Sequence, residues 1–223
     1  MSIYCLIPAR GGSKRIKNKN LLKLNGQPLI NHTIKHALNS MKINKIYVST
    51  DDKKLVNIIP KEISIIKRPK YLSGDFTTTE EVIFHFLTEL IKKKVNVPKY
   101  IVLLQCTSPF REKNDIDKAI RLLIDKKYDS VFSGVINKNL FWVMKKKIKP
   151  INYIPKKRLT EQKMRKQYIE NGSIYVFRTS GFIKSKCRLF GKIGMFIMPK
   201  SKSIQVDDQI DLDMVNLLAK KYL

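Results

Sequence analysis

The segment from residue 8 to residue 20 gathers side chains that bind phosphate groups. An arginine offers a planar fork to two phosphate oxygens, lysines add positive point charges, and hydroxyl and amide groups add neutral hydrogen bonds. These side chains are Arg10, Ser13, Lys14, Lys19 and Asn20. Gly11 and Gly12 lie between them, and residues without a Cβ let the backbone turn sharply and present its N–H groups to an anion. The pattern predicts an anion-binding loop with phosphate as its ligand.

Known phosphate-binding fingerprints narrow this prediction. The segment lacks both the Walker A spacing and the three-glycine dinucleotide fingerprint, so neither a P-loop ATPase nor an NAD site fits. A basic surface turn in a basic protein is the alternative. The apolar run Ile3–Ile7 directly precedes the loop, and open α/β sheets bind ligands where a strand delivers a loop at its carboxyl end. This placement favours the phosphate site.

Polar residues also follow two other apolar runs. Tyr100–Leu104 reads as a buried central strand, and it ends in Gln105, which makes this residue a site candidate. Ile63–Lys67 leads to Arg68 and then to Asp75–Thr79, where an aspartate or a threonine caps a predicted helix.

Four aspartates lie within seven residues before the C-terminal helix, in a chain with only 18 acidic residues. They are Asp207, Asp208, Asp211 and Asp213. One interpretation is helix capping by Asp207 or Asp208, with Asp211 in the first turn. The other is a Mg²⁺ site, because this ion suits one or two carboxylates together with substrate phosphates.

The elements that must position these residues alternate between strand and helix, as in an α/β protein with a parallel sheet. Strands are predicted from Ile3, at Lys45–Thr50, Ile63–Lys67, Tyr100–Leu104, Ser130–Val135, within Tyr168–Phe177 and at Gly194–Met198. Helices are predicted after Pro28, at Lys53–Ile59, Glu80–Lys94, Asp115–Lys126 and Phe182–Ser185, and as an amphipathic C-terminal helix ending at Leu223. Asn25-Gly26 predicts a tight turn. His32 and His36 have metal-binding spacing, but no third ligand is near and we interpret them as ordinary helix residues.

The amino-acid composition limits the classes of protein to which the chain can belong. The 223 residues suit one large domain, residues 1–223, and 43% hydrophobic residues fit a globular core. Cys5, Cys106 and Cys187 are too few and too scattered for a disulfide framework, and no apolar run is long enough to span a bilayer, so we expect no membrane association and a cytoplasmic location. The formal charge of +27 raises an RNA-binding protein as the alternative class, although the lysines are spread over the whole length and we expect no specific nucleic-acid partner.

The run Ile-Pro-Ala-Arg-Gly-Gly-Ser-Lys, followed by Lys19-Asn20, resembles the signature of the acylneuraminate cytidylyltransferases, the CMP-sialic acid synthetase family. Further blocks follow in the family's order: Arg68-Pro69 with the threonine segment, residues 105–109, residues 171–175 and the aspartate block. The resemblance implies a three-layer, open, mostly parallel sheet of the Rossmann-like nucleotidyltransferase type, which joins CMP from CTP to a nine-carbon acidic 2-keto sugar.

The same resemblance implies roles for individual residues. Nucleotide binding falls to Arg10, Gly11, Gly12, Ser13, Lys14, Asn20, Arg68, Thr78, Thr79 and Ser108. Arg10, Lys14 and Lys19 would stabilise charge during catalysis, and Gln105, Trp142 and Asn171 would contact the sugar. Asp207 would hold Mg²⁺, although Gln205 stands where the family has a second aspartate.

Residues 137–169 lack strong periodicity and read as an insertion, which the resemblance identifies as an extension for dimerisation and for part of the sugar site. It implies a homodimer. Trp142 and Ile169 stand where sialic acid enzymes often have a lysine and an arginine, so we expect a less hydroxylated, bis-acylamino sugar such as legionaminic or pseudaminic acid. An eight-carbon sugar, as used by CMP-KDO synthetases, is the nearest alternative.

Overall fold

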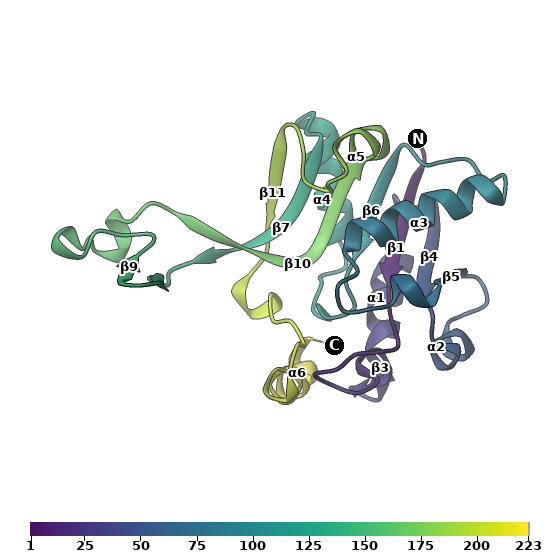
Figure 1. Ribbon diagram of the computed structural model, residues 1–223, viewed down its shortest axis with the longest axis horizontal. Helices are drawn as coiled ribbons and strands as arrows, with labels where there is room; N and C mark the ends of the chain where they lie inside the picture. Colours follow the sequence, from purple (N-terminus) through teal and green to yellow (C-terminus); the bar gives the residue numbers. More distant parts are fainter. Residues whose placement is uncertain (223) are drawn as a thin grey trace.

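A seven-stranded sheet forms the centre of the protein, with the strand order β11-β7-β10-β6-β1-β4-β5 (Figure 1). The computed structural model describes the chain from Met1 to Tyr222. The strands are β1 (Ile3–Pro8), β4 (Lys45–Thr50), β5 (Ser64–Lys67), β6 (Tyr100–Leu104), β7 (Ser130–Asn137), β10 (Gln167–Arg178) and β11 (Ile193–Ile197). β10 runs antiparallel to β6 and β7, whereas the other neighbours are parallel. The predicted mostly parallel sheet is confirmed.

Helices cover both faces of this sheet and give three layers. The helices are α1 (Leu29–Leu38), α2 (Lys53–Ile58), α3 (Thr79–Lys92), α4 (Asp115–Asp125) and α5 (Thr179–Ser185). Side chains of β1 alternate between the faces: Cys5 and Ile7 join the core under α1, α2 and α4, whereas Tyr4 and Leu6 join the core under α3 and α5. This alternation follows from the two-residue period of a strand, and a sheet buried on both faces needs the continuous apolar runs found in β1 and β6.

A third, smaller core lies between the C-terminal helix and the segment that follows β1, residues 16–29. The helix α6 (Gln209–Tyr222) packs Val215 and Leu212 against Ile16 and Leu24. The short elements η1 (Lys19–Leu21), β2 (Lys23–Leu24) and β3 (Gln27–Pro28) complete this region. Asn25 and Gly26 both have positive φ angles, 47° and 77°, as the predicted tight turn requires. Leu223, the predicted end of the helix, lies outside the described residues.

Residues 138–166 form an arm that projects away from the sheet (Figure 1). Its stem is the continuation of β7 and β10, which stay paired as far as Asn137 and Gln167. Its remaining elements are β8 (Trp142–Met144), β9 (Ile148–Pro150), η3 (Pro155–Lys157) and η4 (Glu161–Lys163). Two further short helices lie outside the arm, η2 (Lys70–Leu72) and η5 (Lys200–Lys202). The arm lies within the segment predicted to be an insertion, residues 137–169, whose first residue and last three residues instead belong to β7 and β10. The strand β7 extends two residues further than the sequence indicated.

The start of α3 shows which residue caps it. Thr78 Oγ1 accepts the N–H of Glu81 at 3.2 Å, and the Glu81 carboxylate accepts the N–H of Thr78 at 2.6 Å, which is a capping box. The sequence offered Asp75 or a threonine as the cap of this helix, and the structure uses Thr78. The Asp75 side chain makes a different contact, which is described below. No helix within residues 1–222 combines the length and apolar character needed to cross a bilayer.

The two histidines of α1 bond to backbone carbonyls. His32 Nε2 lies 2.8 Å from the carbonyl of Leu24, and His36 Nε2 lies 3.0 Å from the carbonyl of Pro109. Burial, followed by the positive charge of Arg111, lowers the pKa of His36 to about 4. Both side chains serve the helix packing, as the sequence indicated.

The lowered pKa of His36 predicts a loss of stability in mild acid. The unfolded chain binds a proton near the ordinary value of 6.5, whereas the folded chain resists it down to about 4. The contribution of His36 to the free energy of unfolding is therefore fully present above about pH 6.5 and is lost as the pH decreases toward 4. The loss is at most about 3 kcal/mol for this partly exposed group. Urea unfolding at about pH 7 and about pH 4 should show a smaller loss for His36→Gln than for the wild type. Equal losses would contradict this role.

Candidate active site

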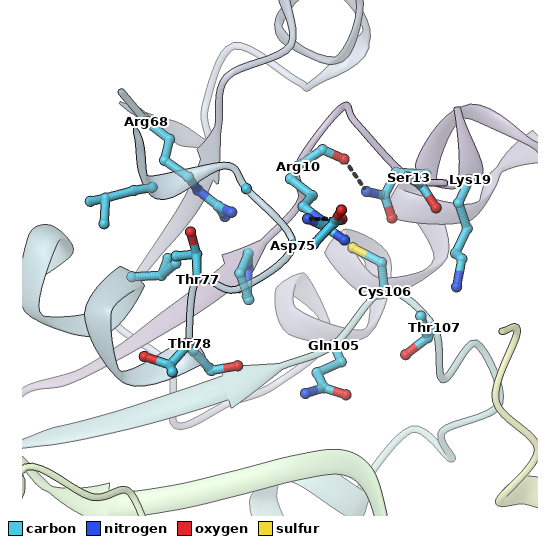
Figure 2. A pocket seen from close by; sticks show the side chains of 16 residues that line it. Arg10, Ser13, Lys19, Arg68, Asp75, Thr77, Thr78, Gln105, Cys106 and Thr107 are labelled. Atoms are coloured by element: carbon cyan, nitrogen blue, oxygen red, sulfur yellow. Dashed lines mark hydrogen bonds and ion pairs between the residues drawn. The ribbon is translucent and has the colours of Figure 1, made fainter. Parts of the chain in front are cut away.

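A cavity of about 290 Å³ opens where β1, β5 and β6 end, at the carboxyl edge of the sheet. It is the place where an open α/β sheet binds ligands. Three segments far apart in the sequence line it, and Figure 2 shows their side chains around one space. The predicted site residues among its lining are Arg10, Ser13, Lys19, Asn20, Arg68, Thr78, Thr79 and Gln105.

The glycine pair has two different environments. The N–H of Gly11 donates to Asp51 Oδ1 at 3.0 Å, so in this structure it is engaged within the protein. A Cβ on Gly11 would lie 2.8 Å from the Cβ of Asp52, and the close approach of these two loops explains the glycine. Gly12 has open space around it and can receive a ligand at short range.

Arg10 and Lys14 share one carboxylate. Asp75 Oδ1 lies 3.0 Å from Arg10 Nη1, and Asp75 Oδ2 lies 2.5 Å from Lys14 Nζ. Hydrogen bonds and charge from Lys14 and then Arg10 hold the pKa of Asp75 below its usual range. Figure 2 shows Asp75 directed at Arg10 inside the cavity. A carboxylate therefore stands against the two cations that the sequence assigned to the triphosphate.

We expect Asp75→Asn to strengthen nucleotide binding. The Asp75 carboxylate competes with an anionic ligand for Arg10 and Lys14, and exposed ion pairs of this kind are weak, so the KM for the nucleotide should fall by about two- to fivefold. Steady-state kinetics measures this. Asp125→Asn, at an exposed position at the end of α4, is the matched control and should leave the KM unchanged. A raised KM in Asp75→Asn would show that the carboxylate assists binding instead.

The aspartate block divides into a helix cap and two carboxylates outside it. Asp208 Oδ1 accepts the N–H of Asp211 at 2.9 Å, and Asp211 Oδ2 accepts the N–H of Asp208 at 3.1 Å, so these two residues form the cap of α6. Asp213 accepts a hydrogen bond from Gln209. Asp207 Oδ1 instead lies 3.1 Å from Lys19 Nζ, a cation of the cavity lining. Of the two candidate caps, the structure uses Asp208.

Gln205 is turned away from this carboxylate. Its Nε2 donates to the carbonyl of Asn171, and its amide packs on Gly172. Within residues 1–222 no three histidine, cysteine, aspartate or glutamate side chains gather in a way that could hold a metal ion without a ligand's help. Asp75 lines the cavity but is paired with Arg10 and Lys14, so of the aspartate block only Asp207, beside Lys19, remains for a cation at this edge.

The wall formed by Arg68, Thr78 and Thr79 is held rigidly. Arg68 is buried, with Nη2 donating to the carbonyl of Ser49 at 2.7 Å and Nε to its hydroxyl at 3.1 Å. Burial lowers the pKa of Arg68 to about 10, which still leaves it positively charged near neutral pH. Thr78 belongs to the helix cap described above. This wall can offer a cation and hydroxyls to a ligand without moving.

Residues predicted to bind the sugar occupy three different places. Gln105 lines the cavity. Asn171 is buried, and its side chain bonds to Ser133 and Ser203, so it shapes the neighbouring turn. Ser108, predicted for the nucleotide, is also buried and donates to the carbonyl of Asn171 at 3.5 Å. Trp142 lies in the arm, edge-on to Tyr153 with ring centroids 5.7 Å apart, and lines no part of the cavity.

Arg111 is a residue that the sequence did not single out. Its buried guanidinium donates to the carbonyls of Ser173 and Gln105 at 2.8 and 2.7 Å and to the hydroxyl of Thr33 at 3.2 Å. Burial lowers its pKa to about 10. The residue joins the end of β6 to the turn in β10 below the cavity. A lone arginine after an apolar pair carries no sequence signal for such a role, because two of its three acceptors, Thr33 and Ser173, come from distant segments.

A family comparison decides what kind of protein has this cavity. Residues 4–191 match the family model described as Cytidylyltransferase. The chain belongs to this family. Cytidylyltransferases are nucleotidyltransferases, and this class of enzyme accounts for the cations and hydroxyls around the cavity. The alternative of an RNA-binding protein is not needed to explain them.

Individual relatives extend the likeness over nearly the whole chain. The flagellin modification protein B of Campylobacter coli is 32% identical, over 98% of this chain and 95% of its own length. The N-acylneuraminate cytidylyltransferase of Streptococcus agalactiae is 31% identical over 95% of this chain, which spans only 52% of that protein. The pseudaminic acid cytidylyltransferase of Campylobacter jejuni is 25% identical, over 99% of this chain and 97% of its own length.

A solved structure confirms the fold of this cytidylyltransferase. The CMP:2-keto-3-deoxy-manno-octonic acid synthetase in complex with CTP superposes with a TM-score of 0.71 at 18% identity and covers the full length of both chains. The Rossmann-like nucleotidyltransferase architecture predicted from the sequence is therefore confirmed.

Proposed function

We propose that this cytidylyltransferase joins CMP from CTP to a nine-carbon 2-keto acid sugar and releases pyrophosphate. One observation carries the proposal: cations and hydroxyls from the segments 10–20, 68–79 and 105–107 surround one cavity at the carboxyl edge of the sheet. Two of the relatives named above are, by their names, cytidylyltransferases of acidic sugars, N-acylneuraminate and pseudaminic acid, and this supports the choice of substrate.

The reaction is an in-line substitution at phosphorus. The anomeric hydroxyl of the sugar attacks the α-phosphorus of CTP, a new P–O bond forms, and the bond to the β-phosphate breaks. Such a reaction depends on positioning and on stabilising the negative charge that grows on the phosphate oxygens. Arg10, Lys14 and Lys19 supply positive charge, and Ser13 and Thr78 supply hydroxyls beside it. Low exposure of the Lys19 side chain, 11%, strengthens its field in the cavity.

We propose Mg²⁺ as the cofactor, held by Asp207. The donor set suits this ion, because Mg²⁺ takes one or two protein carboxylates and completes its coordination with phosphate oxygens and water. The side chain of Asp207 takes no part in the cap of α6, and it is 47% exposed beside Lys19 of the cavity lining. Mg²⁺ held there would supply positive charge to the triphosphate. Lys19 links the Asp207 carboxylate to the cavity, because its Nζ lies 3.1 Å from Asp207 Oδ1 and its side chain belongs to the cavity lining.

The sugar is proposed to bind beside Gln105 and Gly172. A Cβ on Gly172 would lie 2.7 Å from Gln105 Oε1 and 2.9 Å from Gln205 Nε2, so two side-chain amides flank this glycine. Its φ of 65° also favours glycine. Ile169, three residues before Gly172 on β10, is 41% exposed and lines a hollow beside β7 and β11 instead of the cavity. The proposal of a bis-acylamino sugar such as legionaminic or pseudaminic acid therefore rests on the apolar residue at this position, where sialic acid enzymes often have an arginine.

Product analysis tests the sugar. With CTP and Mg²⁺, we expect the specificity constant for legionaminic or pseudaminic acid to exceed that for N-acetylneuraminic acid, by about tenfold or more, since one apolar contact contributes about 1–3 kcal/mol. Mass spectrometry of the CMP-sugar identifies each product. If N-acetylneuraminic acid or the eight-carbon KDO gave the highest constant, the preference would be wrong.

The arm supports a homodimer, which we propose together with a cytoplasmic location. Trp142, Met144 and Ile148 are 46%, 80% and 58% exposed, and monomers rarely expose such a cluster without a partner. Free cysteines at positions 5, 106 and 187 are consistent with a reducing compartment. Light scattering at several protein concentrations measures the oligomeric state.

A further inference from the structure

Four side chains, Glu80, Glu170, Tyr175 and Arg188, form a bridge outside the cavity described above, and this bridge connects two segments that border the cavity. Arg188 is its centre. Its Nη1 lies 2.6 Å from Glu80 Oε1, and its Cζ lies 4.7 Å from the ring centroid of Tyr175. The hydroxyl of Tyr175 donates to Glu170 Oε1. None of these residues has been given a role in the reaction above.

The first end of the bridge is the start of α3. Glu80 follows Thr78 and Thr79, both of which line the cavity on the nucleotide side. The Glu80 and Arg188 side chains are only 24% and 21% exposed. Charges withdrawn from water to this extent need each other, because removing one partner leaves the other poorly solvated. The pairing therefore fixes Arg188 against the first turn of α3.

The second end is the turn beside Gln105. The register advances by five residues on β10, from Glu170 to Tyr175, and by only two on β7, from Gly134 to Phe132. The residues between Glu170 and Tyr175 therefore bulge away from β7, although Ile174 stays paired with Leu104 of β6, and they include Gly172 with its positive φ. Bulges of this kind re-aim residues next to active sites. The hydrogen bond from Tyr175 to Glu170 closes the bulge at its base.

We propose that Arg188 is a positioning residue that sets the distance between the nucleotide-binding start of α3 and the sugar-side turn 171–174. Arg188 contacts both the helix, through Glu80, and the base of the turn, through the face of Tyr175. A planar guanidinium suits this double contact because it pairs with a carboxylate in its plane and stacks on an aromatic ring with its face. The inference rests on the proposed function, since it assigns the turn to the sugar.

The effect of losing Arg188 should fall on the sugar. The start of α3 keeps its own capping box, whereas the turn is irregular backbone that depends on its closing contacts. We expect Arg188→Met to raise the KM for the sugar roughly tenfold, because small misplacements of positioning groups have effects of this order or larger. The KM for CTP should change by less than about twofold. Glu80→Gln should act in the same direction, and the double variant should be no worse than Arg188→Met, since both act through one contact.

Arg178→Met is the matched control. Arg178 lies at the other end of β10, where its Nε is 3.5 Å from Asp129 and its Cζ is 5.6 Å from the ring centroid of Tyr100. It thus has the same combination of carboxylate and aromatic ring far from the cavity edge. If Arg188 only stabilised the fold, both variants would lose thermal stability and neither would change the KM for the sugar. Arg188→Lys should recover part of the effect because it keeps the charge opposite Glu80.

Hydrogen exchange gives a second readout that needs no substrate. Amide exchange within residues 171–174 should speed up in Arg188→Met and in Glu80→Gln, and it should stay unchanged in Arg178→Met. If the wild-type enzyme turned over none of the acidic sugars, the proposed function would be contradicted. The exchange measurement would still test the bridge, because it needs no substrate. Unchanged exchange in this turn, or an unchanged KM for the sugar in a folded Arg188→Met enzyme, would overturn the inference.

Discussion

Arg10→Ala should lower kcat/KM for CTP on the order of a hundred- to a thousandfold while the protein stays folded. Arg10 lines the cavity, and its guanidinium is free to exchange the Asp75 carboxylate for a phosphate group. Removing one group that stabilises charge in a transition state typically costs about 2.7–4 kcal/mol, which corresponds to this loss of rate. Steady-state kinetics and circular dichroism on the same preparation measure both parts of the expectation.

Arg15→Ala is the control for this variant. Arg15 belongs to the same loop and carries the same charge, but its side chain is exposed and it lines no part of the cavity. A loss of activity in both variants would mean that the general positive charge of the loop matters and not the fork of Arg10. Wild-type turnover in folded Arg10→Ala would remove Arg10 from the phosphate site.

Asp207→Asn should raise the Mg²⁺ concentration needed for half-maximal activity, by roughly ten- to a hundredfold, and lower the maximal rate. The substitution removes a charge with little change of shape. The cap of α6 should be unaffected, because the side chains of Asp208 and Asp211 form it and the side chain of Asp207 does not. Initial rates over a Mg²⁺ titration, at saturating CTP and sugar, give the measurement.

Asp213→Asn, six residues further along the chain within α6, separates the metal role from the acidity of the segment. Asp213 accepts a hydrogen bond from Gln209 and should leave the Mg²⁺ dependence unchanged. Because Gln205 contributes no carboxylate, the free protein should bind Mg²⁺ weakly, and its CTP complex more tightly. Tight binding of Mg²⁺ to the free protein would contradict a site completed by phosphates, and an unaltered Mg²⁺ profile in Asp207→Asn would place the ion elsewhere.

The layers of the fold were predictable because local pattern and global burial agree in this chain. β6 is apolar at every position, and it lies in the middle of the sheet with helices on both faces. The direction of β10 was not predictable. A strand in an antiparallel position has the same apolar residues as one in a parallel position when both faces are covered, so only its partners β6 and β7 define its direction.

The candidate site was predictable where one short segment supplies the chemistry. Arg10, Ser13, Lys19 and Asn20 come from a single loop, and the structure brings them to one cavity. Asp75 was visible in the sequence only as a possible cap, since its contact with Arg10 and Lys14 joins loops about sixty residues apart. Arg111 was missed for the same reason. The spacing of residues along a chain carries no information about such distant partners.

Pyrophosphate release by the wild-type protein tests the central claim most directly. The assay combines CTP, Mg²⁺ and a panel of acidic keto sugars that includes N-acetylneuraminic, legionaminic and pseudaminic acids and KDO, and each component is left out in turn. We predict release only when all three components are present, with CTP strongly preferred over ATP, GTP and UTP and with a nine-carbon sugar as the best acceptor. Release that does not depend on the sugar, or no release with any sugar of the panel by a folded protein, would contradict the assignment.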